Sequence, residues 1–347
     1  MSRAALLAAA AAPQVFDPTP PPDTLGSCLA PYESLIDACQ LESDLHRRLR
    51  AYARIALIGP PGCGKSSVVR YALAADDVAM ILINVATEKP KEIATVRGFL
   101  QILVSQLVNR AETAGRISPP QRQKLLTAAQ PTLPLDRKLI SYRASLSGGQ
   151  WLLRGNVARD VTKTIGGGRT YNTTKALRDA AAEALEVVGS HKFVPVLVAD
   201  DTDRLGRVAG KASAKVLGGF FGDVLRELAD SFECGLLIAV HDSYLDSADF
   251  DYRQLTAGLL QDVRMPKLTQ PEQLAAIISR RAAFLTPACG ASELVAPDAL
   301  RALIRLHRDE HARSVRRTLS VLAPALSLAV GDDAAEHVCA RHVTAVD

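Results

Sequence analysis

The sequence lacks the cysteine patterns that hold disulfide-rich and zinc-binding proteins together. Its six cysteines are scattered, at positions 28, 39, 63, 234, 289 and 339. No C-x-x-C pair occurs, and no histidine stands at zinc-finger spacing, so we expect neither a disulfide framework nor a cysteine-based metal site. The formal net charge of +4 is small for 347 residues and by itself indicates no partner.

Long apolar runs are also missing, so no segment is expected to span a bilayer. The first residues, MSRAALLAAAAAP, imitate a secretory signal, with one arginine, a short apolar run and small residues. The cysteine pattern gives no sign of export. We therefore expect a cytoplasmic protein without a membrane segment.

A phosphate-binding loop is the clearest motif in the chain. Residues 59–67 read GPPGCGKSS, which contains the G-x-x-x-x-G-K-S pattern. Glycines let the backbone amides turn inward around phosphates, Lys65 reaches the terminal phosphates, and the Ser66 hydroxyl can hold magnesium. The predicted ATP-binding residues are Gly59, Pro60, Pro61, Gly62, Cys63, Gly64, Lys65, Ser66 and Ser67.

The surroundings of the motif predict an α/β fold with a parallel sheet sandwiched by helices. A strand IALIG precedes the loop, a helix follows it, and further apolar strands are expected at 79–86, 193–200, 234–240 and 262–268. Helical patterns then fill the rest of the chain. We expect an Ala/Pro-rich arm at 1–27, a P-loop core at 28–268 and an all-helical lid at 269–347, with irregular structure at about 115–178.

A pair of acids stands where the apolar strand 193–200 stops, in VLVADDTD. Phosphoryl transfer depends on positioning and on neutralising charge, and both tasks need a carboxylate beside the phosphate loop. Asp200 is predicted to bind the magnesium together with Ser66, and Asp201 to orient the attacking water.

The order of these motifs resembles the AAA+ ATPases, particularly the origin-recognition-like and related STAND branches. GPPGCGKSS is similar to Walker A, VLVADDTD to Walker B, LLIAVHD to the sensor 1 strand and SVRRTLSVL to the sensor 2 helix, so the resemblance covers residues 32 to about 330. It implies a sensor 1 role for His241 and a sensor 2 role for Arg316. It also implies ATP with Mg²⁺ as cofactors and sites shared between the subunits of a homo-oligomer.

Two positions depart from that family pattern. Asp201 stands where a glutamate is usual, and His241 where a small polar residue is common, so slow hydrolysis is expected. An arginine finger, which donates positive charge across a subunit boundary, would come from the region after sensor 1. Arg253 and Arg264 are the candidates, and a plain surface role is the alternative for both.

The letters LSGGQ at 146–150 raise a different possibility, an ABC-type ATPase. In that family one short helix separates this signature from the Walker B strand, whereas Gln150 and Asp200 here stand fifty positions apart. The antiparallel sheet that ABC proteins place before the phosphate loop is not expected here either. We interpret LSGGQ as a coincidence within a glycine-rich loop.

That loop is strongly basic. Residues 136–178 carry nine basic and two acidic side chains, a net charge of +7, interleaved with Tyr142, Trp151 and Tyr171. This combination can follow phosphates while stacking bases. The residues predicted to contact nucleic acid are Trp151, Arg154, Arg159 and Lys163. A solvated loop or a protein-docking flap is the alternative.

Taken together, the motifs predict an ATP-dependent molecular switch or loader that hydrolyses ATP, oligomerises, and engages DNA to recruit a partner protein. A STAND-like signalling or defence ATPase that binds a protein partner without nucleic acid remains the alternative.

Overall fold

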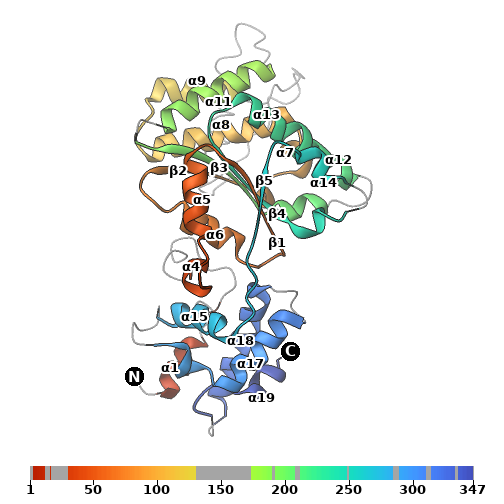
Figure 1. Cartoon of the computed structure of the whole chain (residues 1–347). Coiled ribbons are helices and arrows are strands. Elements are labelled where there is room, and N and C mark those ends of the chain that lie inside the picture. Colours follow the sequence, from red (N-terminus) through yellow and green to blue (C-terminus); the bar gives the residue numbers. More distant parts are fainter. Residues whose placement is uncertain are drawn as a thin grey trace, which may run out of the picture.

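The computed structural model describes residues 3–11, 16, 30–129, 173–189, 192–207, 212–247, 250–283, 289–309, 314–332 and 335–346. These residues form an α/β core and a helical lid below it, and the segment after the last strand joins the two (Figure 1). Among the helices in these ranges, none has the length and apolar character needed to cross a membrane.

Five parallel strands form one sheet, in the spatial order β2-β3-β4-β1-β5. The strands are β1 Arg54–Gly59, β2 Val78–Asn84, β3 Val194–Asp200, β4 Gly235–His241 and β5 Gln261–Arg264. The predicted parallel sheet is therefore confirmed. β5 is shorter than the predicted strand 262–268, since Pro266 has no N–H to continue the ladder.

Helices cover both faces of the sheet because alternate strand residues are apolar on both sides. On one face Ile55 and Leu57 pack with α5 Leu41–Arg50 and α6 Lys65–Ala72. On the other face Ala56 and Ile58 pack with a second set of helices. These are α8 Val96–Thr113, α9 Pro119–Ala129, α11 Thr174–Val188, α12 Ala212–Gly218, a π-helical turn Gly219–Val224, and α13 Leu225–Ser231. Shorter helices are α4 Tyr32–Leu35, α7 Pro90–Ile93 and α14 Tyr252–Thr256.

The lid contains α15 Pro271–Ala282, α16 Ala291–Leu294, α17 Pro297–Asp309, α18 Val315–Val330 and α19 Ala340–Thr344. Proline occupies the first position of α15 and α17, where no N–H is needed. The apolar residues of the lid join the same buried cluster as α5, α6 and one face of the sheet. Core and lid therefore share a continuous apolar contact.

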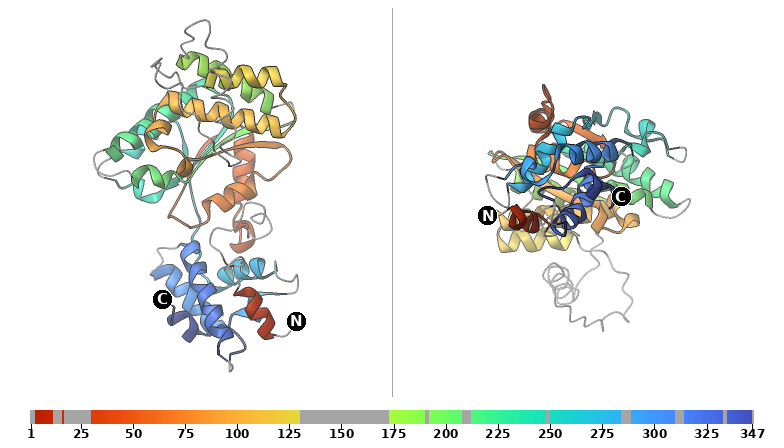
Figure 2. Two further views of the ribbon diagram at one scale, coloured as in Figure 1. Left: turned by 180° about the vertical axis from the view of Figure 1, so that it is seen from behind. Right: turned by 90° about the horizontal axis from the view of Figure 1, so that it is seen from below.

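Two sequence predictions need correction. The helix α9 lies inside the stretch expected to be irregular, since Pro119 and Pro120 occupy its first turn and Ser118 accepts a hydrogen bond from the Gln121 N–H at 3.4 Å. The expected N-terminal arm also contains a helix, α1 Arg3–Ala10, which packs against α18 and α16 and buries Leu7. Views from behind and below show α1 beside the lid (Figure 2).

Candidate functional site

The ends of three adjacent parallel strands meet at one pocket. The chain leaves β1 into residues 59–65, leaves β3 at Asp200, and leaves β4 at His241. Because β4 lies between β1 and β3, the loop and the acidic strand end are two strand spacings apart, about 10 Å. Crevices outside the carboxyl ends of parallel strands are where α/β sheets bind ligands. The pocket is lined by Pro61, Gly62, Gly64, Lys65, Ser66, Ser67, Asp200, Asp201, Thr202, Asp203, Ala239, His241, Val315 and Arg316.

Two glycines give the loop after β1 its shape. Gly62 has φ +74° and Gly64 has φ +104°, which side-chain-bearing residues rarely adopt. Gly64 is also the residue before α6, so the first N–H groups of that helix face the pocket. A Cβ at Gly62 would lie 2.9 Å from the Arg316 Cβ, so the loop has no room for a side chain there.

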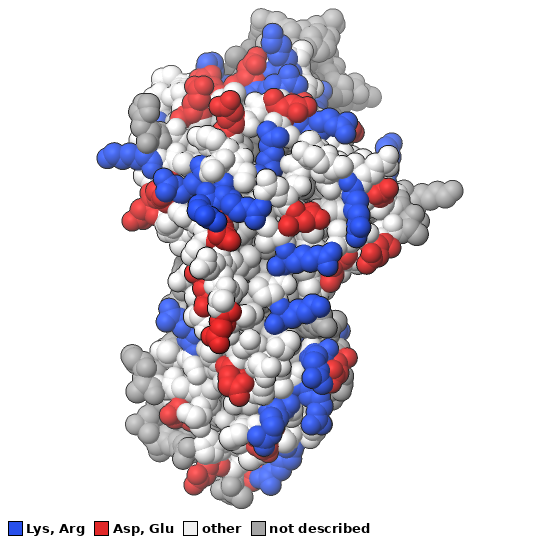
Figure 3. Space-filling view, viewed as in Figure 1, with Lys and Arg blue, Asp and Glu red and all other residues white. Residues whose placement is uncertain are grey.

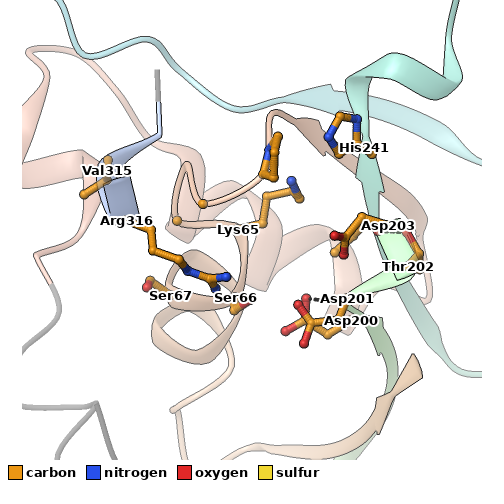
Figure 4. Close-up of a pocket in the computed structure, with 14 residues that line it drawn as sticks. Lys65, Ser66, Ser67, Asp200, Asp201, Thr202, Asp203, His241, Val315 and Arg316 are labelled. Carbon is orange, nitrogen blue, oxygen red and sulfur yellow. Dashed lines mark hydrogen bonds between the residues drawn. The ribbon is translucent and has the colours of Figure 1, made fainter. Parts of the chain in front are cut away.

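Lys65 holds the loop from within. Its Nζ donates hydrogen bonds to the carbonyl oxygens of Gly59 at 2.6 Å and Pro60 at 2.9 Å. The ammonium group is therefore held against the carbonyl oxygens of the loop, and Figure 4 shows the Lys65 side chain inside the pocket. This is the position from which a cation can neutralise a bound phosphate.

Asp200 and Asp201 form the acidic side of the pocket, as predicted. Asp200 is buried at the end of β3 and accepts a hydrogen bond from the Asp201 N–H at 2.9 Å. Asp201 has φ +57°, a left-handed conformation that aspartate tolerates better than most residues. Desolvation and the neighbouring carboxylates of Asp200 and Asp203 raise the pKa of Asp201, while Arg316 acts in the opposite direction.

The turn that follows these acids is tied to β4. The Thr202 hydroxyl donates to the Ala239 carbonyl, and the Tyr244 hydroxyl donates to the Thr202 carbonyl at 2.8 Å. Tyr244 also accepts the N–H of Gly206 at 3.2 Å. These bonds fix the acidic turn relative to the strand that carries His241.

His241 lines the pocket at the end of β4, where the sensor 1 resemblance places it. Its Nδ1 accepts the Ser243 N–H at 3.0 Å, which requires that this nitrogen carry no proton. Asp242 Oδ1 lies 3.2 Å from the same nitrogen, a contact that becomes an ion pair when the ring is protonated. The proton of the neutral ring lies on Nε2.

Arg316 reaches the pocket from the lid. Its backbone N–H donates to the Gly62 carbonyl at 3.1 Å, so the first turn of α18 touches the loop directly. The side chain extends from that turn toward Ser66 and the acids (Figure 4). Ser314 caps α18 by accepting the Arg317 N–H at 3.3 Å. The predicted lid arginine thus belongs to the same pocket as the loop and the acids.

Sequence reasoning missed Tyr32, which supports the loop from behind. The buried Tyr32 hydroxyl donates to the Cys63 carbonyl at 2.6 Å, and its ring lies 3.7 Å from a Cβ built at Gly64. The buried Glu42 accepts the Tyr32 N–H at 2.6 Å and so holds the short helix α4 in place. No motif marks such a residue, because its role depends on a contact between segments thirty-one positions apart.

The remaining predicted site residues lie elsewhere. Arg264 is exposed at the end of β5 and lines a second hollow rather than the pocket, and Arg253 is exposed on α14. Neither completes the site of its own chain, and a role at another subunit's site stays a prediction. Trp151, Arg154, Arg159 and Lys163 fall outside the described residues, as does LSGGQ. Lys175 and Arg178, counted with the basic stretch, belong to α11, where Arg178 pairs with Glu227 at 2.5 Å.

The residues present fit a nucleoside triphosphate with magnesium. The left-handed glycines and the start of α6 supply inward-facing N–H groups, and Lys65 supplies a cation. The described residues hold no group of three or more His, Cys, Asp or Glu side chains suited to a metal on their own. Magnesium normally keeps several waters and binds through one or two carboxylates plus substrate phosphates, and Ser66 and Asp200 are suited to that arrangement.

Comparison with models of known protein families gives no match for this chain, and neither does comparison with curated protein sequences.

Proposed function

We propose that this protein is an ATPase of the AAA+ type, which binds ATP with Mg²⁺ in the pocket at the strand ends and hydrolyses it. The observation that supports this most is the meeting of the loop, Lys65, the acids Asp200 and Asp201, and the lid residue Arg316 in one pocket. These groups come from three separate parts of the chain: residues 59–67, the end of β3 and the start of α18. A chance sequence match to a loop motif would not bring the other two parts to it.

Each residue then has a chemical task. The N–H groups of the loop and Lys65 hold the phosphates, Ser66 and Asp200 hold the magnesium, and Asp201 orients the attacking water. Magnesium, when bound, neutralises charge that develops on the phosphate oxygens. Arg316 can neutralise the same charge, and because it stands on α18 it connects the bound phosphates to the lid. His241 donates through Nε2 at the end of β4, where it can contact the terminal phosphate or the water.

A phosphate-release assay with Mg²⁺ tests this proposal. Asp201→Asn is expected to lower turnover about 100-fold or more, the range for loss of a group that assists proton transfer. Asp230→Asn, on the exposed side of α13, is the matched control and should turn over like the wild type. Equal turnover in the two variants would contradict the role of Asp201.

We further propose that the ATP-bound protein assembles into a homo-oligomer and engages DNA to recruit a partner protein. The basic composition of residues 136–178 supports DNA as the polymer. The direct contact between the lid and the phosphate loop supports a switch, because a change at the phosphates is passed to α18.

That same contact also favours a second candidate, a STAND-like monomer closed by its own lid. In that case a protein partner, and no nucleic acid, would open it. Sedimentation with a non-hydrolysable ATP analogue separates the two, because only the first candidate forms larger species.

A further inference from the structure

A row of basic side chains crosses from the core to the lid, beside a hollow that Gly59, Pro60 and Cys63 of the phosphate loop also line. It consists of Arg264, Lys267, Arg308, Arg305 and Arg301, and we call it the basic track. Arg264, Lys267 and Arg308 line one hollow beside the joint between core and lid. Arg305 and Arg301 continue along the exposed face of α17, one helical turn apart. Figure 3 shows Lys and Arg side chains in a column that crosses this joint and descends the lid.

The cations of the track are largely available. All five side chains are exposed, and within the described ranges Lys267, Arg301 and Arg305 form no ion pair. Arg308 is hydrogen-bonded to Asp309 at 2.9 Å, an exposed pair of the kind that contributes little to stability. Arg48 donates to the side chain of Gln261 and adds a cation at the start of β5.

Several acids lie beside the track. Asp242 lines the same hollow, and Asp262 is exposed on β5. Asp298, at the start of α17, accepts the Ala340 N–H at 3.1 Å. Hydrogen bonding from Ala340 is the main cause that lowers the pKa of Asp298, and the charge of the nearby Arg301 also contributes.

The basic track is long, and no large exposed hydrophobic side chain accompanies its cations on β5 or α17. From Gln261 to Arg264 the strand spans about 10 Å, the extended joint to Lys267 about the same, and α17 from Arg308 to Arg301 about another 10 Å. Among the described residues the exposed large hydrophobic side chains are Tyr52, Tyr71, Leu328 and Val330, and none lies on β5 or α17. Protein interfaces rely on buried aromatic and aliphatic anchors, whereas contacts to a nucleic-acid backbone rely on spaced cations.

We propose that the basic track binds the phosphate backbone of duplex DNA. The inference rests on the DNA engagement proposed above, but it assigns that engagement to a surface on β5 and α17 rather than to residues 136–178. Because the track bridges core and lid, DNA held on it would contact both parts of the molecule. No base-specific contact is implied, so binding should depend on salt and be nearly independent of sequence.

Fluorescence anisotropy with a labelled random-sequence duplex, titrated across a salt series, tests the proposal on the full chain. Arg301→Glu/Arg305→Glu is compared with Arg110→Glu/Arg226→Glu, which makes the same charge change on exposed arginines of α8 and α13. The track variant is expected to bind at least about 10-fold more weakly, with a salt slope reduced by about 2. The control should stay within about 3-fold of wild type. The neutral pair Arg301→Gln/Arg305→Gln should show the same reduced slope.

ATPase rates of the same variants, measured beside DNA binding, distinguish failure of the track proposal from failure of the proposed DNA engagement. Track variants that bind duplex like the control, while Arg154→Glu/Arg159→Glu/Lys163→Glu abolishes binding, would overturn the track and leave DNA engagement intact. A wild type that hydrolyses ATP but binds no duplex at low salt would overturn both. Tight binding of an acidic polypeptide, with none of duplex, would also overturn the proposal and favour a protein partner.

Discussion

Asp201 combines backbone strain and charge crowding in one pocket residue. It combines a left-handed backbone with a carboxylate that is crowded by Asp200 and Asp203 and partly removed from water. Each of these features costs free energy in the folded state, and strained or crowded groups cluster at functional sites. The raised pKa means that the folded protein holds this proton more tightly than the unfolded chain does.

This predicts that Asp201→Asn makes the protein more stable at neutral pH, by about 0.5–2 kcal/mol. Between the unfolded pKa and the raised folded pKa, the folded state binds more protons, so stability falls as pH rises. Above both the unfolded and the folded pKa, the ionised carboxylate destabilises the folded state by its full amount. Asparagine has no such charge and also tolerates a positive φ. Thermal melts at several pH values test this. The gain should shrink as pH falls toward the unfolded pKa, and a pH-independent gain would show that the carboxylate is not its source.

Tyr32 is a second residue on which the phosphate loop depends, and Tyr32→Phe is expected to weaken the support of that loop. The change leaves the buried Cys63 carbonyl without its partner, which costs about 1–3 kcal/mol of stability. A loosened loop should also raise the Kd for nucleotide without changing the pH dependence of turnover, because the hydroxyl does not touch the phosphates. Nucleotide titration beside a thermal melt measures both effects. An unchanged Kd in a destabilised variant would limit Tyr32 to a structural role.

The residues that the sequence predicted well are those whose chemistry requires a fixed local pattern. The phosphate loop and the acids at a strand end are of this kind, and the structure brings both to one pocket with Arg316. Tyr32 and Ser314 could not be predicted in the same way. Their roles arise only when α4 and α18, from opposite ends of the chain, meet at the loop.

At the scale of elements, the end of α5 is built as a Schellman motif with an unusual residue in it. Tyr52 N–H donates to the Leu49 carbonyl and Ala53 N–H to the Arg48 carbonyl, both at 3.0 Å. Tyr52 has φ +60°, at the position where glycine is usual, and its side chain is 49% exposed. The side chain is therefore buried too little to offset the backbone strain.

Tyr52→Gly is accordingly expected to stabilise the protein by about 0.5–1 kcal/mol, because relief of the left-handed strain exceeds the added freedom of the unfolded chain. Tyr71→Gly is the control. That tyrosine is similarly exposed, at 44%, but lies within α6, so glycine there should destabilise by about 1 kcal/mol. Urea denaturation of both variants provides the comparison. A loss of stability in Tyr52→Gly would mean that the tyrosine makes a favourable contact at that position.

The elements were predictable where periodicity was strong and where strands were apolar on both faces. Strands β1 to β4 and the helix at 174–188 follow directly from such patterns. α9 was missed because a double proline was interpreted as a break, although proline is accommodated in a first helical turn. The N-terminal helix α1 was missed because its alanine-rich sequence becomes amphipathic only against the lid, where Leu7 and Ala10 are buried.

At the scale of the whole molecule, the core and the lid both contribute residues to one pocket. Arg253 and Arg264 are exposed on the core and do not reach their own pocket. If either acts as an arginine finger, ATP with Mg²⁺ should drive formation of higher oligomers, and Arg→Ala at that position should reduce turnover while leaving nucleotide affinity within about 3-fold. Sedimentation with a non-hydrolysable analogue tests assembly. A strict monomer under every nucleotide would favour the STAND-like closed form.

The central claim is that the pocket at the strand ends binds ATP with Mg²⁺, and calorimetric titration of nucleotide into the full-length protein tests it most directly. Wild type should bind ATP with Mg²⁺ at one site per chain. Lys65→Ala should weaken binding about 100-fold or more, since it removes a cation from a phosphate. Lys91→Ala, at the surface of α7, should bind like the wild type. No heat of binding for the wild type, or equal affinity in Lys65→Ala, would contradict the account.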